Sequence, residues 1–164
     1  GLPKWLSENR IVSEKFSEGS IGNFVAELRK DLFCDFQVVL EGLDSPNCAV
    51  LDARSERRFK GLDPEPRPGV RSGHMPNAKN LPFPEVLNGG LLKSVSELQE
   101  IFINLSLDHQ DAIITSCGSG ITACILTLAA DVAGFSRLSV YDGSWAEWGL
   151  PGKLPVVSDL TNNA

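Results

Sequence analysis

Three short apolar segments constrain the fold of this chain more than any other feature. Residues 48–52, 112–115 and 138–141 have the length of buried strands, and turn residues follow each of them. Segments with helical apolar spacing lie between these runs. Strands that alternate with helices predict an α/β fold, a parallel sheet with helices on both faces. In such a sheet, functional groups collect at the carboxyl ends of the strands.

Four segments have the apolar spacing and the end residues of helices. They are expected over residues 20–32, 35–43, 94–102 and 121–133, with Ser20, Asp35 and Ser94 or Ser96 as N-cap candidates. Ser94 and Glu97 have the spacing of a capping box, and Gly134 is typical of the residue that follows a helix. Residues 60–90 are rich in Gly and Pro and are expected to be mostly loop.

The composition excludes several functional classes. The chain has 164 residues, which suits one domain, and it carries 15 basic against 21 acidic residues, a net charge of −6. This acidic balance argues against nucleic acid or an anionic membrane as a partner. No apolar run reaches the roughly 18 residues of a membrane span. The four cysteines lack metal-site spacing and are expected to be reduced thiols in a reducing, intracellular compartment.

The segment Thr115–Ala123, TSCGSGITA, carries the strongest sign of chemistry. It brings Cys117 from the end of an expected strand into a glycine-rich turn before a helix. Backbone N–H groups in such a turn form an anion cradle, and the helix start adds its dipole. We therefore expect a thiol pKa below the free value of about 8.5. The predicted cradle consists of Gly118, Ser119, Gly120, Ile121 and Thr122.

The alternative interpretation of Cys117 is a buried structural cysteine before an ordinary turn, since free cysteines are commonly buried. The two glycines and the two hydroxyls of Ser119 and Thr122 favour function. Cys124, by contrast, is expected to pack in the core with the apolar face of its helix. Cys34 and Cys48 receive the same structural interpretation.

A cysteine in an anion cradle suits two chemistries. Phosphate ester hydrolysis uses the pattern C-x5-R, in which the arginine holds the phosphoryl oxygens. Ala123 occupies the arginine position, and the loop contains no basic residue, so a phosphatase is disfavoured. Sulfur transfer through a cysteine persulfide needs no such arginine.

The loop resembles the active-site loop of the rhodanese superfamily, and its CGSG form resembles 3-mercaptopyruvate sulfurtransferases more than thiosulfate sulfurtransferases. Further similarity lies in the segments VLDAR, RFKG, PEPR, GHMP and YDGSWAEW. The resemblance extends over about residues 46–150. It implies a three-layer rhodanese-like fold and sulfur transfer from 3-mercaptopyruvate to a thiol such as thioredoxin, or to cyanide. It implies no metal or organic cofactor.

The resemblance also implies roles for individual residues. Cys117 is the nucleophile, Arg58 and Arg67 bind the carboxylate and carbonyl of the donor, and Ser119 belongs to a Ser-His-Asp relay. The His and Asp of that relay lie in an upstream rhodanese domain in this family. Without the resemblance, the sequence favours solvent-facing side chains of a charged stretch over substrate binding for Arg58 and Arg67.

The resemblance divides the chain at residue 46. Residues 1–45 are expected to be the tail of the upstream domain and a connecting segment, and residues 46–164 the catalytic domain. A weak internal similarity between GLPKW at residue 1 and SWAEW at residue 144 agrees with that division.

Two other functions stay open: a thiosulfate sulfurtransferase, and a sulfur-carrier or interaction module with little turnover. Both the cytoplasm and the mitochondrion fit the sequence. The remaining polar and aromatic side chains are expected to be structural or solvated: an Asp52–Arg54 pair, a hydrogen-bonded His74, a surface His109, packed Trp145 and Trp148, and solvated Asp63 and Glu65.

Overall fold

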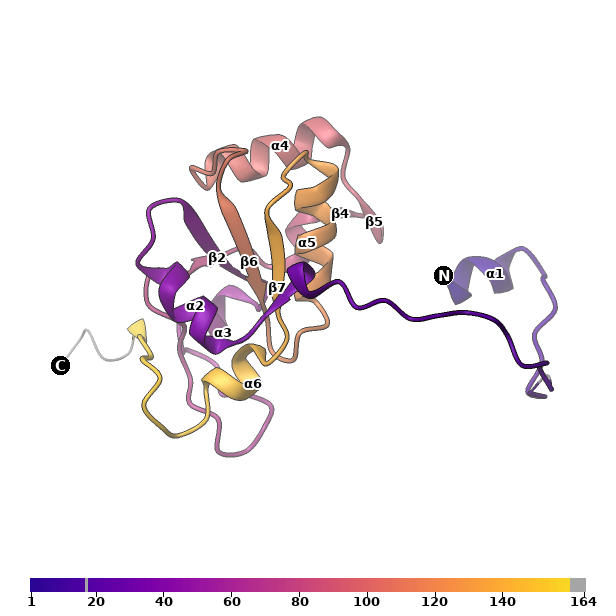
Figure 1. The fold of residues 1–164 in the computed structure, drawn as a ribbon, viewed down its shortest axis with the longest axis horizontal. Coiled ribbons are helices and arrows are strands. Elements are labelled where there is room, and N and C mark those ends of the chain that lie inside the picture. Colours follow the sequence, from indigo (N-terminus) through magenta and orange to yellow (C-terminus); the bar gives the residue numbers. More distant parts are fainter. Residues whose placement is uncertain (17, 160–164) are drawn as a thin grey trace.

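A parallel sheet forms the centre of the molecule in the computed structural model, which describes residues 1–16 and 18–159 (Figure 1). The end of the predicted catalytic domain, residues 160–164, lies outside the described residues. The five strands run in the order β1-β7-β6-β2-β3, and all neighbours are parallel. They are β1 (Phe33–Cys34), β2 (Cys48–Asp52), β3 (Lys79–Asn80), β6 (Ala112–Ser116) and β7 (Leu138–Tyr141). The three predicted strands are thus confirmed.

Helices lie before, between and after the strands, and three of them carry a predicted end signal. They are α1 (Leu2–Ser7), α2 (Phe36–Leu43), α3 (Glu56–Phe59), α4 (Val95–Asn104), α5 (Ala123–Val132) and α6 (Ser144–Trp148). The Asp35 carboxylate accepts the backbone N–H groups of Gln37 and Val38 at the start of α2. Ser94 and Glu97 form a complete capping box on α4, and Gly134 follows α5 with a φ of 100°.

The region between β2 and α4 is mostly loop, as predicted. Its regular elements are short: besides α3 and β3, a 3-10 helix η2 (Phe83–Val86) precedes an antiparallel pair, β4 (Leu87–Asn88) and β5 (Leu91–Leu92). This long connection passes over the carboxyl ends of the strands, where it supplies side chains to the candidate site.

Two hydrophobic cores lie on opposite faces of the sheet. Side chains alternate along β2, so Leu51 enters one core and Val50 the other. Helices α4 and α5 cover the first face, whereas α2 and α6 cover the second (Figure 1). This arrangement confirms the three-layer α/β fold.

The helix expected over residues 20–32 is wrong. Residues 18–29 are extended, and only a 3-10 turn, η1 (Lys30–Leu32), forms at the end of the segment. Ile21, Phe24 and Val25 are at least 85% exposed, so the apolar face has no surface to pack against. An isolated helix of about 12 residues is marginal without such packing.

The structural unit begins before the predicted boundary at residue 46. Strand β1 pairs with β7, and Val39 of α2 is fully buried against the sheet. Residues 33–43 therefore pack with the domain, while residues 1–16 and 18–29 extend away from it (Figure 1). The strand has two residues, too few for a recognisable pattern in the sequence.

Leu126 and Leu128 on α5 offer a matched test of this packing. Leu126 is fully buried in the first core, and Leu128 is 54% exposed. We expect Leu126→Ala to lower the free energy of unfolding by about 2–5 kcal/mol. Leu128→Ala is expected to change it by less than about 0.5 kcal/mol. Urea denaturation measures both, and equal losses would contradict the assignment of the buried face.

Candidate active site

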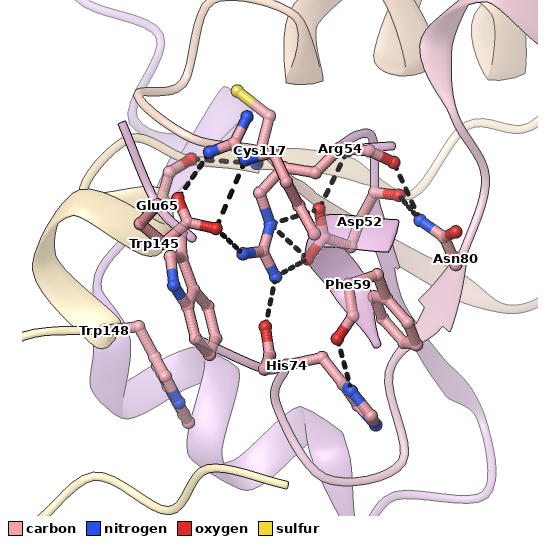
Figure 2. Close-up of polar contacts among 12 residues, drawn as sticks. Asp52, Arg54, Phe59, Glu65, His74, Asn80, Cys117, Trp145 and Trp148 are labelled. Carbon is pink, nitrogen blue, oxygen red and sulfur yellow. Dashed lines mark hydrogen bonds and ion pairs between the residues drawn. The ribbon is translucent and has the colours of Figure 1, made fainter. Parts of the chain in front are cut away.

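Cys117 lies at the carboxyl end of β6, where the structure places it at the entrance of a tight loop before α5 (Figure 2). The residue is 2% exposed. The adjacent strands β2 and β6 both end in polar residues at this edge, where Asp52 of β2 is paired with Ser116 of β6. The carboxyl edge of the sheet therefore carries the candidate site, as predicted.

The pKa of the Cys117 thiol lies below its ordinary value. Burial acts in the opposite direction, since it disfavours the charged thiolate. Hydrogen bonds from the Thr122 hydroxyl and from the backbone N–H groups of Ser119, Ala123 and Thr122 outweigh that effect. Ala123 was not part of the predicted cradle. Its amide reaches the sulfur because α5 begins there.

Glycine is required at the two positions of the loop for different structural reasons. Gly120 has a φ of 85°, and a Cβ there would lie 3.0 Å from the carbonyl oxygen of Asp142. A Cβ on Gly118 would lie 3.2 Å from Nη2 of Arg58. Glycine therefore allows the tight turn at residue 120 and the close approach of a guanidinium at residue 118. Ile121, the apolar member of the loop, is 75% exposed.

The start of α6 holds the Cys117 loop from the opposite side. The Ser144 hydroxyl accepts the Cys117 N–H at 3.1 Å and donates to the Tyr141 carbonyl at 2.8 Å. The N–H groups of Trp145 and Ala146 donate to the carbonyls of Cys117 and Gly118, both at 2.9 Å. Ser144 is fully buried and has a φ of 48°, which is strained for a residue with a side chain. Sequence reasoning singled out this segment as a family motif but did not detect its contact with Cys117.

Arg58, Arg67 and Ser119 meet at one pocket of about 220 Å³. Gly118 also lines this pocket, so it lies directly beside the Cys117 loop. Arg67 is exposed at the pocket, whereas the side chain of Arg58 is 26% exposed. The structure thus brings together the two arginines and the loop serine that the family resemblance had grouped.

A group of buried charged side chains adjoins the pocket through Glu65, and Figure 2 shows their contacts. The Arg54 guanidinium contacts the Asp52 carboxylate at 2.6 Å and Oε1 of Glu65 at 2.8 Å. It lies over the Trp145 ring, 4.1 Å from the centroid. The predicted Asp52–Arg54 pair is confirmed. The prediction that Glu65 is solvated is wrong: its side chain is 4% exposed and also pairs with Arg58.

The remaining predicted structural side chains have the expected environments. Nδ1 of His74 lies 2.8 Å from the Phe59 carbonyl, and its ring stacks on that of Phe59. Trp145 and Trp148 are fully buried in the second core. His109 is exposed, with its ring 4.7 Å from that of Phe135.

Cys124 is not a core residue, contrary to the prediction. It is exposed on α5 and lines a larger pocket of about 810 Å³ together with Leu128. The first turn of α5 faces outward at this position, so helical spacing alone assigned it to the wrong face. Cys34 and Cys48 are half-buried, and burial raises the pKa of both thiols. The Cys117 thiol therefore differs from both in the direction of its shift.

Comparison with known proteins establishes the family. Residues 35–150 match the model of the rhodanese-like domain. The chain belongs to the rhodanese family. It is 40% identical over 149 residues to the 3-mercaptopyruvate sulfurtransferase of Mus musculus, covering 90% of this chain and 50% of the relative. It is 37% identical over 150 residues to the thiosulfate sulfurtransferase of Cricetulus griseus, again covering 90% of this chain and 50% of the relative.

The rhodanese fold is also similar to solved structures. The crystal structure of SseA from Escherichia coli, a 3-mercaptopyruvate sulfotransferase, matches with a TM-score of 0.74 at 31% identity. The match covers 88% of this chain and 54% of SseA. The chain thus spans about half the length of the relatives it matches.

The described part of the chain provides no helix long and apolar enough to cross a membrane. Within residues 1–16 and 18–159, no three His, Cys, Asp or Glu side chains come together in a way that could hold a metal ion.

Thr122 tests the origin of the Cys117 pKa. In Thr122→Val the hydroxyl that favours the thiolate is lost, so the Cys117 pKa rises and less thiolate is present near neutral pH. The pH profile of iodoacetamide alkylation is expected to move to higher pH. The measurement uses a Cys124→Ser background, which removes the exposed thiol. An unchanged midpoint would contradict the role of the hydroxyl.

Ser144 tests the contact between α6 and the loop. Ser144→Ala leaves the buried Cys117 N–H without its acceptor and is expected to lower the free energy of unfolding by about 1–3 kcal/mol. Ser144→Gly removes the same hydroxyl but accommodates the positive φ, so it is expected to be the milder change. Urea denaturation compares the two, and a milder effect of alanine would contradict the strain at this position.

Proposed function

We propose that this chain is the catalytic rhodanese domain of a 3-mercaptopyruvate sulfurtransferase. The observation that carries the proposal is a thiol of lowered pKa in a loop without basic side chains, next to a pocket lined by two arginines. Planar guanidinium groups suit a carboxylate and an adjacent carbonyl. The names of the relatives support the same donor.

The proposed reaction has two steps. The Cys117 thiolate attacks the donor sulfur, the bond between that sulfur and carbon breaks, and its electron pair leaves on carbon as the enolate of pyruvate. A proton taken up by the enolate gives pyruvate, and Cys117 is left as a persulfide. Backbone N–H groups around the sulfur stabilise the thiolate and the persulfide anion.

The named side chains have distinct roles in this proposal. Arg58 and Arg67 orient the carboxylate and carbonyl of the donor. Ser119 lines the same pocket, which supports a role in passing a proton to or from the substrate as part of a relay with groups of an upstream domain.

A thiol acceptor such as thioredoxin completes the cycle. The acceptor thiolate attacks the outer sulfur of the persulfide, takes that sulfur and releases the Cys117 thiolate. Cyanide acts in the same way and leaves as thiocyanate. Because a free Cys117 thiolate needs a reducing environment, we place the protein in the cytoplasm or the mitochondrion.

Thiosulfate is the second candidate donor. The 37% identity to a thiosulfate sulfurtransferase favours it, and the two arginines near the loop suit an anion. The absence of a basic side chain in the sequence 118–122 favours the monoanionic mercaptopyruvate.

An upstream rhodanese domain is part of the proposal. Trp5 on α1 and Trp148 on α6 both donate their indole N–H to a backbone carbonyl a few residues further on, that of Ile11 at 3.0 Å and that of Pro155 at 2.7 Å. Trp148 is fully buried, whereas Trp5 is 44% exposed. Residues 1–12 thus resemble the segment after α6 in their local contacts. In our proposal, the core on which residues 1–12 pack lies in an upstream domain.

Sulfur loading tests the donor assignment. The chain is exposed separately to 3-mercaptopyruvate and to thiosulfate, and its intact mass is measured before and after a cyanide chase. We expect a gain of one sulfur atom from 3-mercaptopyruvate, reversed by cyanide and absent in Cys117→Ser. Arg67→Ala is expected to slow loading at least about tenfold, since it removes a charge-assisted contact.

The other outcomes separate the alternatives. Loading from thiosulfate alone would support the second candidate. No loading from either donor, here and in a chain joined to an upstream rhodanese domain, would contradict both and leave the sulfur-carrier module. Wild-type loading in Arg67→Ala would contradict the role of that arginine.

A further inference from the structure

Glu65 is a buried carboxylate for which the sulfur-transfer chemistry has no use. It belongs to the Gly- and Pro-rich connection between β2 and α4, yet its side chain is 4% exposed. Its Oε1 accepts from Nη1 of Arg54 at 2.8 Å and from Nε of Arg58 at 3.2 Å. Its Oε2 accepts from Nη2 of Arg58 at 2.5 Å. One carboxylate therefore joins two arginines of different exposure.

Arg54 is the fixed member of this group. Its side chain is 1% exposed, and it also donates to the Asp52 carboxylate and, at 2.8 Å, to the Gly73 carbonyl. The Trp145 ring also packs against the Arg54 guanidinium, which therefore has contacts in several directions. Arg54 therefore anchors Glu65 to the rigid end of β2.

Arg58 is the more exposed of the two arginines, with a side chain 26% exposed, and it forms an ion pair with Glu65 at the pocket that Gly118 also lines. The guanidinium is packed against the loop, because a Cβ on Gly118 would lie 3.2 Å from Nη2. A long arginine side chain on the short helix α3 has considerable rotamer freedom. The bidentate contact with Glu65 removes that freedom before any ligand arrives, which lowers the entropic cost of binding.

We propose that Glu65 is a positioning residue that holds the Arg58 guanidinium against the Cys117 loop, where it receives the carboxylate of an incoming anion. The inference rests on the proposed function, in which Arg58 orients an anionic donor. The length of the Glu65 side chain is essential, because it allows one carboxylate to contact both Arg54 and Arg58. An aspartate side chain is one methylene shorter. Glu65→Asp therefore keeps the negative charge and gives up the simultaneous contact.

Competing alkylation rates test this role without any sulfur donor. Iodoacetate and iodoacetamide both alkylate the Cys117 thiolate with loss of iodide, but only iodoacetate carries a carboxylate. Because both rates depend on the same thiolate, their ratio reports how well the pocket attracts and orients an anion. The measurement uses the Cys124→Ser background, so that the exposed thiol does not contribute.

We expect Glu65→Asp to lower the ratio of iodoacetate to iodoacetamide rates about three- to tenfold, the effect of a weakened charge-assisted contact. Arg58→Ala is expected to lower it at least as much. If Glu65 acts through Arg58, adding Glu65→Asp to Arg58→Ala has no further effect. Asp63→Glu is the matched control, because it also changes an acidic side chain by one methylene and keeps the charge. Asp63 pairs with Arg57 of α3, and its side chain is 39% exposed against 4% for Glu65, so the ratio is expected to stay unchanged.

Three results would overturn the proposal: an unchanged ratio in Glu65→Asp, an equal further decrease in the Arg58→Ala background, or an unchanged ratio in Arg58→Ala itself. The iodoacetamide rate and the thermal midpoint show whether each variant keeps its fold. If Glu65→Asp does not fold, Glu65→Gln replaces it. Losing the negative charge alone would raise the ratio, so a decrease in Glu65→Gln supports positioning and an increase overturns it.

The outcome is independent of the donor assignment. A chain that takes no sulfur from 3-mercaptopyruvate can still show the decrease in the alkylation ratio, and a chain that takes sulfur can lack it. Failure of the positioning role and failure of the proposed function are therefore seen in different measurements.

Discussion

The buried Arg54 guanidinium joins four parts of this structure. It connects Asp52 at the end of β2, the loop carbonyl of Gly73, the Glu65 carboxylate and the Trp145 ring of α6. A buried charge is tolerated only when partners and hydrogen bonds compensate for its lost hydration. Removing one partner of such a buried pair typically costs about 3–5 kcal/mol. The long connection after β2 and the closing segment are thereby tied to the edge of the sheet that carries Cys117.

A balance of opposing effects defines the thiol itself. Burial in the first core favours the neutral form of Cys117, while the N–H groups at the start of α5 and the Thr122 hydroxyl favour the thiolate. The second effect is larger because several hydrogen-bond donors converge on one sulfur. The closing helix α6 keeps these donors in place by binding the backbone of Cys117 and Gly118 from the other side.

An acidic chain can present a site for anions because the local field depends on nearby groups. The net charge of −6 belongs to the whole chain, whereas the pocket beside Cys117 is lined by two guanidinium groups and one carboxylate, that of Glu65, next to a loop of backbone amides. Membership in the rhodanese family agrees with this arrangement. The chain spans about half the length of its relatives. In our proposal, the exposed Trp5 and the extended residues 18–29 lie next to an upstream domain.

Local features of the sequence determined much of the fold. Strands β2, β6 and β7, the capping box of α4, the glycine after α5 and the CGSG loop follow from periodicity, caps and backbone freedom, all of which act between residues close in the chain. The grouping of Arg58, Arg67 and Ser119 came from the family resemblance, and the structure brings these residues to one pocket.

Only the tertiary structure decided which side chains are buried and which segments meet. Glu65 is charged and lies in a loop, so its sequence context indicates solvent; it is buried because Arg54 and Arg58 surround it. Cys124 has helical spacing typical of the core but faces outward, and residues 20–29 have a helical pattern without a surface to pack on. The contact of Ser144 with Cys117 joins residues 27 positions apart in the chain. Burial and long-range hydrogen bonds depend on the packing of distant segments, which no local pattern records.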